Sequence, residues 1–277
     1  MEKLKYDVLE NLDDYVNKEI PHDATVCRRP LFHGTTRFAI DADPAVLSAF
    51  YDHCKTIVQK ARVYSRALPD KEAFHKSLDR LIEEKKISVD WAHVYTFGTL
   101  RDYSYGDFYV TTGYLRALHY RKNAGGELGK LAYNVALALE YLGIDLGIEE
   151  SVSFVKKLYP SFAESESVVL IAENVAFSDL FTEHGDPFLP DKDSPWYAED
   201  VVFSLTEIYE EEIESEGKSS VDSYRVAHPE NYRFKMIPSA LLREGIGLFT
   251  KISDVDRFLE SPTSFDLRRK NAEDYGV

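Results

Sequence analysis

The chain has 277 residues, of which 44% are hydrophobic and 13% aromatic, and its formal net charge is −15. This composition is typical of a folded globular protein and excludes a disordered tail. The acidity disfavours sequence-independent nucleic-acid binding, which needs a dense Lys and Arg footprint on the phosphate backbone. A local basic groove would still admit nucleic acid, and a basic protein partner is equally compatible with this charge.

Cys27 and Cys54 are too few for a disulfide framework or a cysteine-rich zinc site, so both are expected to be buried thiols. The histidines form no His-x-x-x-His pair, and we expect no metal. No apolar run reaches the roughly 18 residues of a membrane span, and the first residues lack the apolar core of a signal peptide. We therefore expect no membrane contact and a cytoplasmic protein, although delivery into a target cell by a signal-less route would leave no trace.

The first predicted strand covers residues 29–33 and is entered through a proline. A helix is expected from Asp43 to about Arg66, because apolar residues recur there at spacings of three and four. A second helix is expected after Pro69-Asp70. Residues 92–97 then predict the next strand.

The remaining elements also mix strands and helices. Residues 108–111 predict a strand after a glycine turn, and helices are expected over 113–122 and 127–141. Further strands are expected at 167–172, 223–227 and 232–237. Because strands and helices do not alternate as a regular βαβ series, we expect an α+β fold. No internal repeat or low-complexity linker is visible, which favours one domain over 1–277 with a helical insertion at about 43–90.

Two glycine-containing runs resemble nucleotide-binding motifs but lack the residues that those motifs require at fixed spacings. The glycines of 125–130 suggest a phosphate loop, but Ala124 and Leu131 occupy positions where that loop needs Gly and Ser or Thr. We interpret this run as a glycine break between two helices. Gly245-Ile246-Gly247 has no third glycine at the dinucleotide-binding spacing. The acidic run 210–216 indicates the solvated end of a helix.

Two short blocks fit chemistry on NAD. Cleavage of the nicotinamide–ribose bond needs a clamped dinucleotide and a carboxylate that stabilises an oxocarbenium-like state. A neutral imidazole suits the ribose hydroxyls, and an aromatic face suits nicotinamide. His33 ends a short apolar strand, and Gly34 after it allows close backbone approach to a ligand. Tyr109 lies in a short strand where its ring can project into a cleft.

Leu31-Phe32-His33-Gly34-Thr35-Thr36 resembles the first strand of ADP-ribosyltransferases of the His-Tyr-Glu class, which is the diphtheria toxin and poly(ADP-ribose) polymerase-like class. Gly106-Asp107-Phe108-Tyr109-Val110-Thr111-Thr112, followed by Ala117-Leu118-His119-Tyr120, is similar to the second block. The resemblance implies an ADP-ribosyltransferase-like α+β fold, with a NAD cleft in a sheet split in two. It also implies transfer of ADP-ribose from NAD to a macromolecular acceptor, protein or nucleic acid, with release of nicotinamide.

The same resemblance implies residue roles. His33 is expected to hold a ribose hydroxyl, Gly34 to bind the nicotinamide carboxamide, and Tyr109 to stack on nicotinamide, with Tyr103 or Tyr105 on the other side of the ring. The residues expected to contact NAD are His33, Gly34, Thr35, Tyr105, Tyr109, Tyr120 and Arg37. Four arginines flank the blocks as candidates for the pyrophosphate: Arg28, Arg29, Arg37 and Arg101.

The third catalytic position, beside His33 and Tyr109, is an acidic residue that the family places at the start of a late strand. Residues 232–237 resemble that strand, and Glu230 and Asn231 precede it. Glu230 is our choice, because a carboxylate can stabilise positive charge. Asn231 is the alternative by register, and it would make the transfer weaker or restricted to fewer targets.

Other readings stay open. The Arg-Ser-Glu branch of the superfamily would take its acidic pair from Glu210-x-Glu212 or Glu214-x-Glu216, but the histidine before Gly34 argues against it. NAD hydrolysis would replace the acceptor by water. A catalytically inactive nucleotide- or protein-binding module on the same fold is a further alternative. Because the class includes toxins, an antitoxin or another regulator protein is a further expected partner.

Overall fold

The computed structural model describes residues 3–13, 18–19, 26–89, 91–96, 108–121, 125–182, 185–189, 223–242 and 250–251. The chain divides into two compact units. The unit that carries most of the helices comprises Met1–Lys3, Thr35–Gly106 and Tyr120–Ser167, and the unit that carries most of the strands comprises Leu4–Gly34, Asp107–His119 and Val168–Val277.

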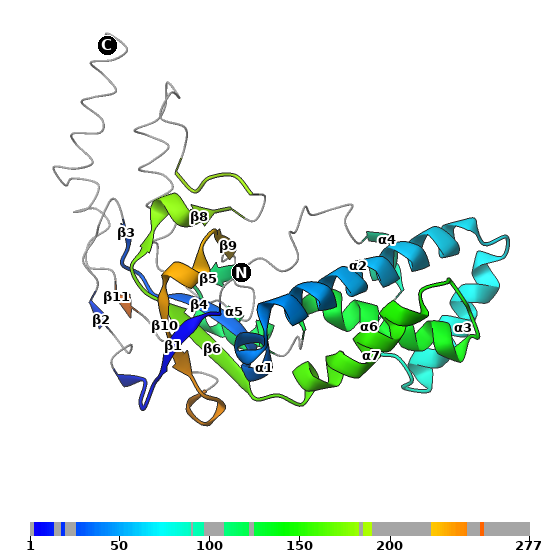
Figure 1. Cartoon of the computed structure of the whole chain (residues 1–277), viewed down its shortest axis with the longest axis horizontal. Helices are drawn as coiled ribbons and strands as arrows, with labels where there is room; N and C mark the ends of the chain where they lie inside the picture. Colours follow the sequence, from blue (N-terminus) through cyan, green and yellow to red (C-terminus); the bar gives the residue numbers. More distant parts are fainter. Residues whose placement is uncertain are drawn as a thin grey trace, which may run out of the picture. The chain divides into compact units, whose positions relative to one another are not determined.

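Seven α-helices and three short 3-10 helices are seen in these ranges, and in the helical unit α2, α6 and α7 pack alongside one another (Figure 1). The α-helices are α1 (Arg37–Asp41), α2 (Pro44–Ala67), α3 (Lys71–Glu83), α4 (Ala92–Thr96), α5 (Tyr114–Tyr120), α6 (Gly126–Tyr141) and α7 (Glu149–Ala163). The 3-10 helices are η2 (Phe177–Asp179), η3 (Pro229–Asn231) and η4 (Ser239–Leu241).

The first two long helices, α2 and α3, begin at capping aspartates. The Asp43 carboxylate accepts a hydrogen bond from the backbone N–H of Ala45 at 2.8 Å, and that of Asp70 accepts one from Ala73 at 2.9 Å. Such a bond satisfies one of the amides that a helix leaves unpaired at its start. The helices predicted after these residues are confirmed. The helical unit also includes α6 and α7, so its helices extend beyond the expected insertion at 43–90.

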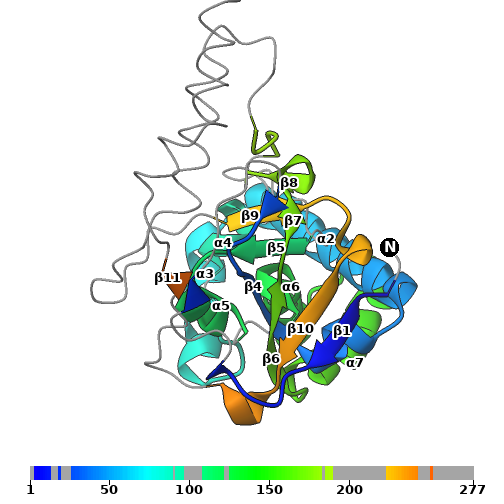
Figure 2. The same cartoon turned by 90° about the vertical axis from the view of Figure 1, so that its left-hand side faces the viewer.

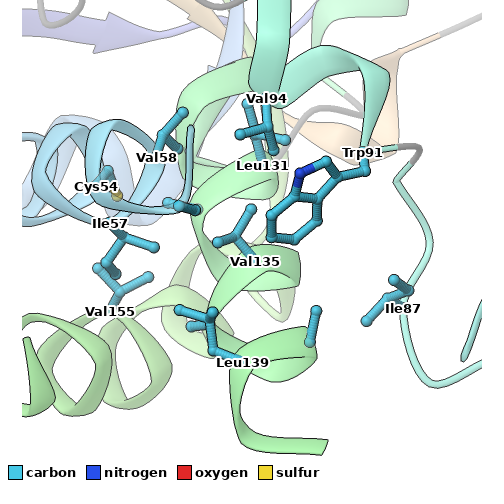
Figure 3. Close-up of a cluster of buried hydrophobic side chains, with 14 of the residues drawn as sticks. Cys54, Ile57, Val58, Ile87, Trp91, Val94, Leu131, Val135, Leu139 and Val155 are labelled. Atoms are coloured by element: carbon cyan, nitrogen blue, oxygen red, sulfur yellow. The ribbon is translucent and has the colours of Figure 1, made fainter. Parts of the chain in front are cut away.

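The core of the helical unit is built from apolar faces of α2 and α6. Cys54, Ile57 and Val58 of α2 are fully buried, as the 3.6-residue period requires, and they gather with Val135 of α6 (Figure 3). Loops and shorter helices add their own apolar side chains to this cluster. Cys27 in the other unit is also a free, buried thiol, so the expectation for both cysteines is confirmed.

The strand predicted at 92–97 is wrong, because residues 92–96 form the short helix α4. The backbone N–H of Val94 bonds the carbonyl of Trp91 at 2.8 Å, and both side chains are buried in the helical core (Figure 3). A spacing of three residues puts these side chains on one helical face. Packing against the core therefore overrides the β propensity of this run.

The glycine break before α6 is confirmed. Gly125 caps the helix with a φ of 69°, and Gly126 follows with a φ of 68°. Residues with a Cβ avoid this left-handed region, so two consecutive glycines suit it. The Gly125-to-Lys130 run therefore turns the chain into a helix.

Seven strands form one mixed sheet in the order β1-β10-β6-β4-β5-β9-β8, and Figure 2 shows β6, β10 and β1 side by side. The expected split into two sheets is not found for these strands, because β4 lies beside β6 and joins the two halves. The sheet and its helices confirm the α+β class. The strands are β1 (Lys5–Val8), β4 (Leu31–Thr36), β5 (Phe108–Thr111), β6 (Ser167–Ala172), β8 (Leu180–Phe181), β9 (Ser223–Val226) and β10 (Arg233–Ile237). Two small pairs join β2 (Lys18–Glu19) to β11 (Thr250–Lys251) and β3 (Val26–Cys27) to β7 (Val175–Ala176).

One face of the large sheet is covered by α5. Phe32 of β4 packs edge-on against Tyr114 of α5, with ring centroids 5.7 Å apart. Ile171 and Ile237 join the same buried cluster. Among the helices that the structure describes, none has both the length and the apolar character needed to cross a membrane.

Candidate functional site

The two blocks that resemble NAD-binding strands lie next to each other. Phe32 of β4 is paired in the antiparallel ladder with Thr111 of β5. The sequence separates these strands by the helices α1 to α4, so their pairing is a long-range feature of the fold. The site can therefore be built from β4, β5 and the strand β9 that pairs with β5.

His33 is fixed in this strand pair by its backbone neighbour. Its Nδ1 atom lies 2.6 Å from the carbonyl oxygen of Tyr109. A carbonyl can only accept, so Nδ1 carries the proton, and in the neutral ring Nε2 holds the lone pair. The imidazole therefore presents an acceptor at Nε2.

Aromatic rings hold the same imidazole from the side. The His33 ring stacks on Phe108 with centroids 4.2 Å apart and planes inclined by 30°. Phe108 in turn contacts Phe234 of β10 at 5.1 Å. Burial lowers the pKa of His33 to about 4, and this effect exceeds the opposite one of the hydrogen bond to Tyr109. The ring is thus neutral at neutral pH.

The rings of His33 and Tyr109 leave opposite faces of the sheet. Phe108 and Tyr109 are consecutive on β5, so their side chains point to opposite faces. The His33 ring stacks on Phe108 and therefore lies on the Phe108 face. The structure brings together the imidazole and the backbone of Tyr109, but it does not bring together the two rings.

The Tyr109 ring shares its face with a cation. Tyr109 is paired with Arg225 of β9, and Arg225 is paired with Phe181 of β8. Directly opposite residues in antiparallel strands project from the same face. The Arg225 guanidinium carbon lies 4.4 Å from the centroid of the Phe181 ring, which is a cation–π contact. All three side chains are half-buried.

Glu230 lies in η3, in the connection from β9 to β10. Its Oε1 atom is 3.5 Å from Nδ1 of His228, while its Oε2 atom is buried without a hydrogen-bond partner among the described residues. A buried carboxylate oxygen without a donor is unusual and costly. In the strand order, β6 and β4 stand between β10 and the Tyr109 strand, so Glu230 precedes a strand that is not adjacent to β5.

The connection that carries Glu230 is tied down by Tyr232. Its hydroxyl donates to the Asp179 carboxylate at 2.6 Å and accepts from the backbone N–H of Ala176 at 3.2 Å. Burial and the bond to Asp179 raise the pKa of Tyr232 to about 12. These two bonds attach the start of β10 to the segment that leads into β8.

The other expected residues occupy varied environments. Gly34 and Thr35 follow His33 on β4 and are half-buried, as is Tyr120 at the end of α5. The Arg37 guanidinium donates to the Asp41 carboxylate within α1. Arg28 donates to Asn174, and Arg29 is buried. The residues that lie outside the described part of the chain are Tyr103, Tyr105, Arg101, Glu210, Glu212, Glu214 and Glu216.

Three features of the site were not predicted from the sequence. They are the stacking of Phe108 on His33, the contact of Phe234 with Phe108, and the position of Arg225 beside Tyr109. Of these three features, only the position of Arg225 could have been recognised in the sequence. Arg225 is a lone cation between Tyr224 and Val226 in a predicted strand, and this alternation is typical of a strand with one solvated face.

In the part of the chain that the structure covers, no group of three or more His, Cys, Asp or Glu side chains is arranged to hold a metal ion. Comparisons with protein-family models, with curated proteins and with solved structures find no match to this chain. The residues and their geometry alone therefore carry the functional argument.

Proposed function

We propose that this chain is an ADP-ribosyltransferase that uses NAD as its substrate. The observation that carries the proposal is the pairing of β4 with β5, in which His33 donates to the carbonyl of Tyr109. Two sequence blocks that resemble NAD-binding strands are thus neighbours in space. This pairing supports a shared site, because it fixes the imidazole and the tyrosine backbone in one unit of the chain.

The residues of this strand pair suit the nicotinamide half of NAD. A neutral His33 with its proton on Nδ1 accepts a hydrogen bond from a ribose hydroxyl at Nε2. The backbone of Gly34 binds the carboxamide, because no side chain blocks its approach. Tyr109 takes part through its backbone carbonyl, because its ring leaves the face of the sheet opposite to the His33 imidazole and β4 is enclosed between β6 and β5.

In the proposed reaction the bond between ribose C1′ and the nicotinamide nitrogen breaks, and its electron pair leaves with nicotinamide. The ribose becomes oxocarbenium-like, and an acceptor nucleophile forms the new bond at C1′ while losing its proton. A carboxylate stabilises the positive charge on the ribose. Glu230 is the proposed carboxylate, with Asn231 as the alternative position, because Glu230 has a buried oxygen that lacks a donor in the described structure.

Nicotinamide release from NAD tests this function. The purified chain is incubated with NAD and candidate protein, DNA and RNA acceptors, and free nicotinamide and labelled acceptor are both measured. Release with labelled acceptor supports transfer, whereas release without it indicates NAD hydrolysis. The matched variants His33→Ala and His53→Ala separate the site from the helical unit, since only His33 lies in β4. Absence of nicotinamide release with every acceptor would overturn the proposal.

One observation favours a second candidate, a nucleotide-binding module without turnover. The neighbouring strands β4, β5 and β9 carry no Asp or Glu in their described residues. If no carboxylate reaches the ribose, NAD binds but its glycosidic bond is not activated. Calorimetry that shows NAD binding, combined with no nicotinamide release, would identify this case.

A further inference from the structure

We propose that one face of α2 is a docking surface for an acidic, amphipathic helical segment of a partner protein. This basic face consists of Lys55, Gln59, Lys60, Val63 and Arg66. Its residues alternate with the buried positions of α2 at the helical period, so they lie on the side away from the core. The inference concerns the helical unit alone and does not depend on the proposed NAD-dependent function.

The second half of α2 carries only positive charge. The sequence has no Asp or Glu between Asp52 and the end of the helix at Ala67. Over the same span it has four cations, which are Lys55, Lys60, Arg62 and Arg66. Charges act over about 8 Å at physiological salt, so a basic surface attracts anions even on a chain whose net charge is −15.

Three of these cations have no ion pair with another residue that the structure describes. They are Lys55, Lys60 and Arg66, of which the last two are exposed and the first is half-buried. Arg62 is half-buried and interacts with another part of the chain, so the basic face does not include it. The positive charge of the other three is therefore not neutralised within the described structure.

The neighbouring helix α3 shows the contrasting arrangement. Lys76 of α3 forms an ion pair with Glu72, and Arg80 forms one with Glu84, each four residues apart. Such pairs are common on solvated helix faces and neutralise the charge locally. The cations of α3 and α2 thus differ in what they leave for an external anion.

A valine lies among the unpaired cations of α2. Val63 is 66% exposed, the highest value among the large hydrophobic residues on the described surface. Lys60 precedes it by three residues and Arg66 follows it by three, so both are its neighbours on the helix surface. Valine forms helices less well than alanine or leucine, so this exposed position does not serve the stability of the helix. An apolar centre within a polar rim is typical of protein interfaces.

These features favour a protein partner over nucleic acid. The basic face contains no aromatic side chain on which the bases of a single strand could stack. A long polyanion would also be repelled by the rest of an acidic chain, whereas a short acidic segment contacts only the basic face. Lys55 and Arg66 lie about 16 Å apart along the helix axis, the length of three helical turns. A partner helix of that length can place Glu side chains opposite the cations and an apolar side chain on Val63.

The test uses two labelled helical peptides of about 18 residues, or five turns. The acidic peptide has Glu at spacings of three and four around a central Leu, and the neutral peptide has Gln at the same positions. Fluorescence anisotropy measures their binding to the whole chain. The wild type should bind the acidic peptide about 10- to 100-fold more tightly, because each of several exposed charge pairs contributes about two- to fivefold. At about 1 M salt this preference should disappear, since the Debye length falls to about 3 Å.

The double variant Lys60→Gln/Arg66→Gln should reduce the preference by about 5- to 20-fold. Its matched control is Lys76→Gln/Arg80→Gln, which removes the same charges from exposed positions of α3 and should leave the preference intact. Val63→Asn should weaken the binding of both peptides equally, by about two- to tenfold, because it removes apolar contact and no charge.

Three outcomes would overturn the inference. They are no binding of either peptide, equal affinities of the wild type for both, and equal losses in the two double variants. A DNA duplex or single strand of the same charge that binds the basic face more tightly than the acidic peptide would identify it as a nucleic-acid surface instead. Thermal unfolding checks that each variant folds, and if one does not, the wild-type preference and its salt dependence still decide. Nicotinamide release tests the proposed function separately.

Discussion

The imidazole of His33 donates from Nδ1 to the carbonyl oxygen of Tyr109 at 2.6 Å, across the ladder between β4 and β5. This single bond sets the tautomer of the histidine and leaves its other nitrogen as an acceptor. The bond also connects two residues of neighbouring strands whose rings lie on opposite faces of the sheet. The link runs through the backbone of Tyr109 and not through its phenol ring.

We expect His33 to stay neutral down to about pH 4, because burial lowers its pKa to about that value. Nicotinamide release should then lose no activity through His33 between pH 8 and pH 6 and should fall only as the pH approaches 4. Nitrogen-15 NMR of the imidazole in the whole chain checks this, since the shifts report both the pKa and the tautomer. A His33 that titrates near 6.5, or that carries its proton on Nε2, would contradict the geometry.

The same pKa makes a prediction for stability. The folded pKa lies below the unfolded value of about 6.5, so between pH 6.5 and 4 the unfolded state binds more protons. The contribution of His33 is therefore present above about pH 6.5 and is lost as the pH falls towards 4. Its upper limit is about 3 kcal/mol, from a difference of roughly 2.5 pKa units. Urea unfolding of the wild type and of His33→Gln across this range measures it, and parallel curves for the two proteins would argue against it.

Phe108→Leu should lower the free energy of unfolding by about 1–3 kcal/mol, since it removes two ring contacts and leaves a partly filled space. It should also raise the pKa of His33 towards its ordinary value, because the imidazole loses the ring that covers it. Phe74→Leu is the matched control, because Phe74 is equally buried, at 8%, and contacts Trp91 in the helical unit. Only the first variant should move the His33 titration. Equal His33 pKa values in both variants would show that Phe108 does not set the environment of the imidazole.

The sequence correctly predicted the helices whose first residues are marked by capping aspartates or by glycines. Asp43 and Asp70 cap α2 and α3 at the predicted starts, and the glycines at 125–126 begin α6. The resemblance assigned the two blocks to one NAD site, but the pairing of β4 with β5 itself was not predicted. The correctly predicted features depend on residues that are close in sequence.

Tertiary packing decided the elements that the sequence did not predict correctly. Residues 92–97 have β propensity, yet Trp91 and Val94 are buried together on one face of a helix. The helix α7 was not predicted, and Pro160 in its last turns is a residue that normally ends a helix. No sequence pattern indicates that β9, and not β10, pairs with the Tyr109 strand, since this follows from long-range strand order. The position of Glu230 relative to the Tyr109 strand could not be predicted for the same reason.

Gly129→Ala in α6 should destabilise the helical unit although alanine is the better helix former. An added Cβ would lie 3.0 and 3.1 Å from two ring carbons of Phe50, which is fully buried and contacts Phe162 at 4.7 Å. The ring has little room to move, so we expect a net loss of about 1–3 kcal/mol despite a helix-propensity gain of about 1 kcal/mol. Urea unfolding measures the change, and an unchanged or higher stability would show that the ring yields.

Gly143→Ala provides a comparison for this variant. Its φ is 64° and an added Cβ would meet no atom within 4 Å, so its cost of about 1–2 kcal/mol comes from the backbone alone. The near-ultraviolet circular dichroism of the aromatic core should change in Gly129→Ala and stay constant in Gly143→Ala. A changed spectrum in both would indicate that the core responds to any substitution.

Glu230→Gln tests the third catalytic position, where charge and shape can be separated. The substitution keeps the volume of the side chain but removes the charge that the proposed reaction needs on the ribose. We expect nicotinamide release to fall by about 100-fold or more with NAD binding unchanged, which is the size of effect seen when one group that stabilises a developing charge is removed. Because Oε2 is buried without a partner in the described structure, the neutral amide should not lower the free energy of unfolding, and this separates a chemical effect from a structural one.

Asn231→Ala is the control for the neighbouring position. If it abolishes release while Glu230→Gln does not, the site is completed by Asn231, and if neither does, the carboxylate comes from another part of the chain.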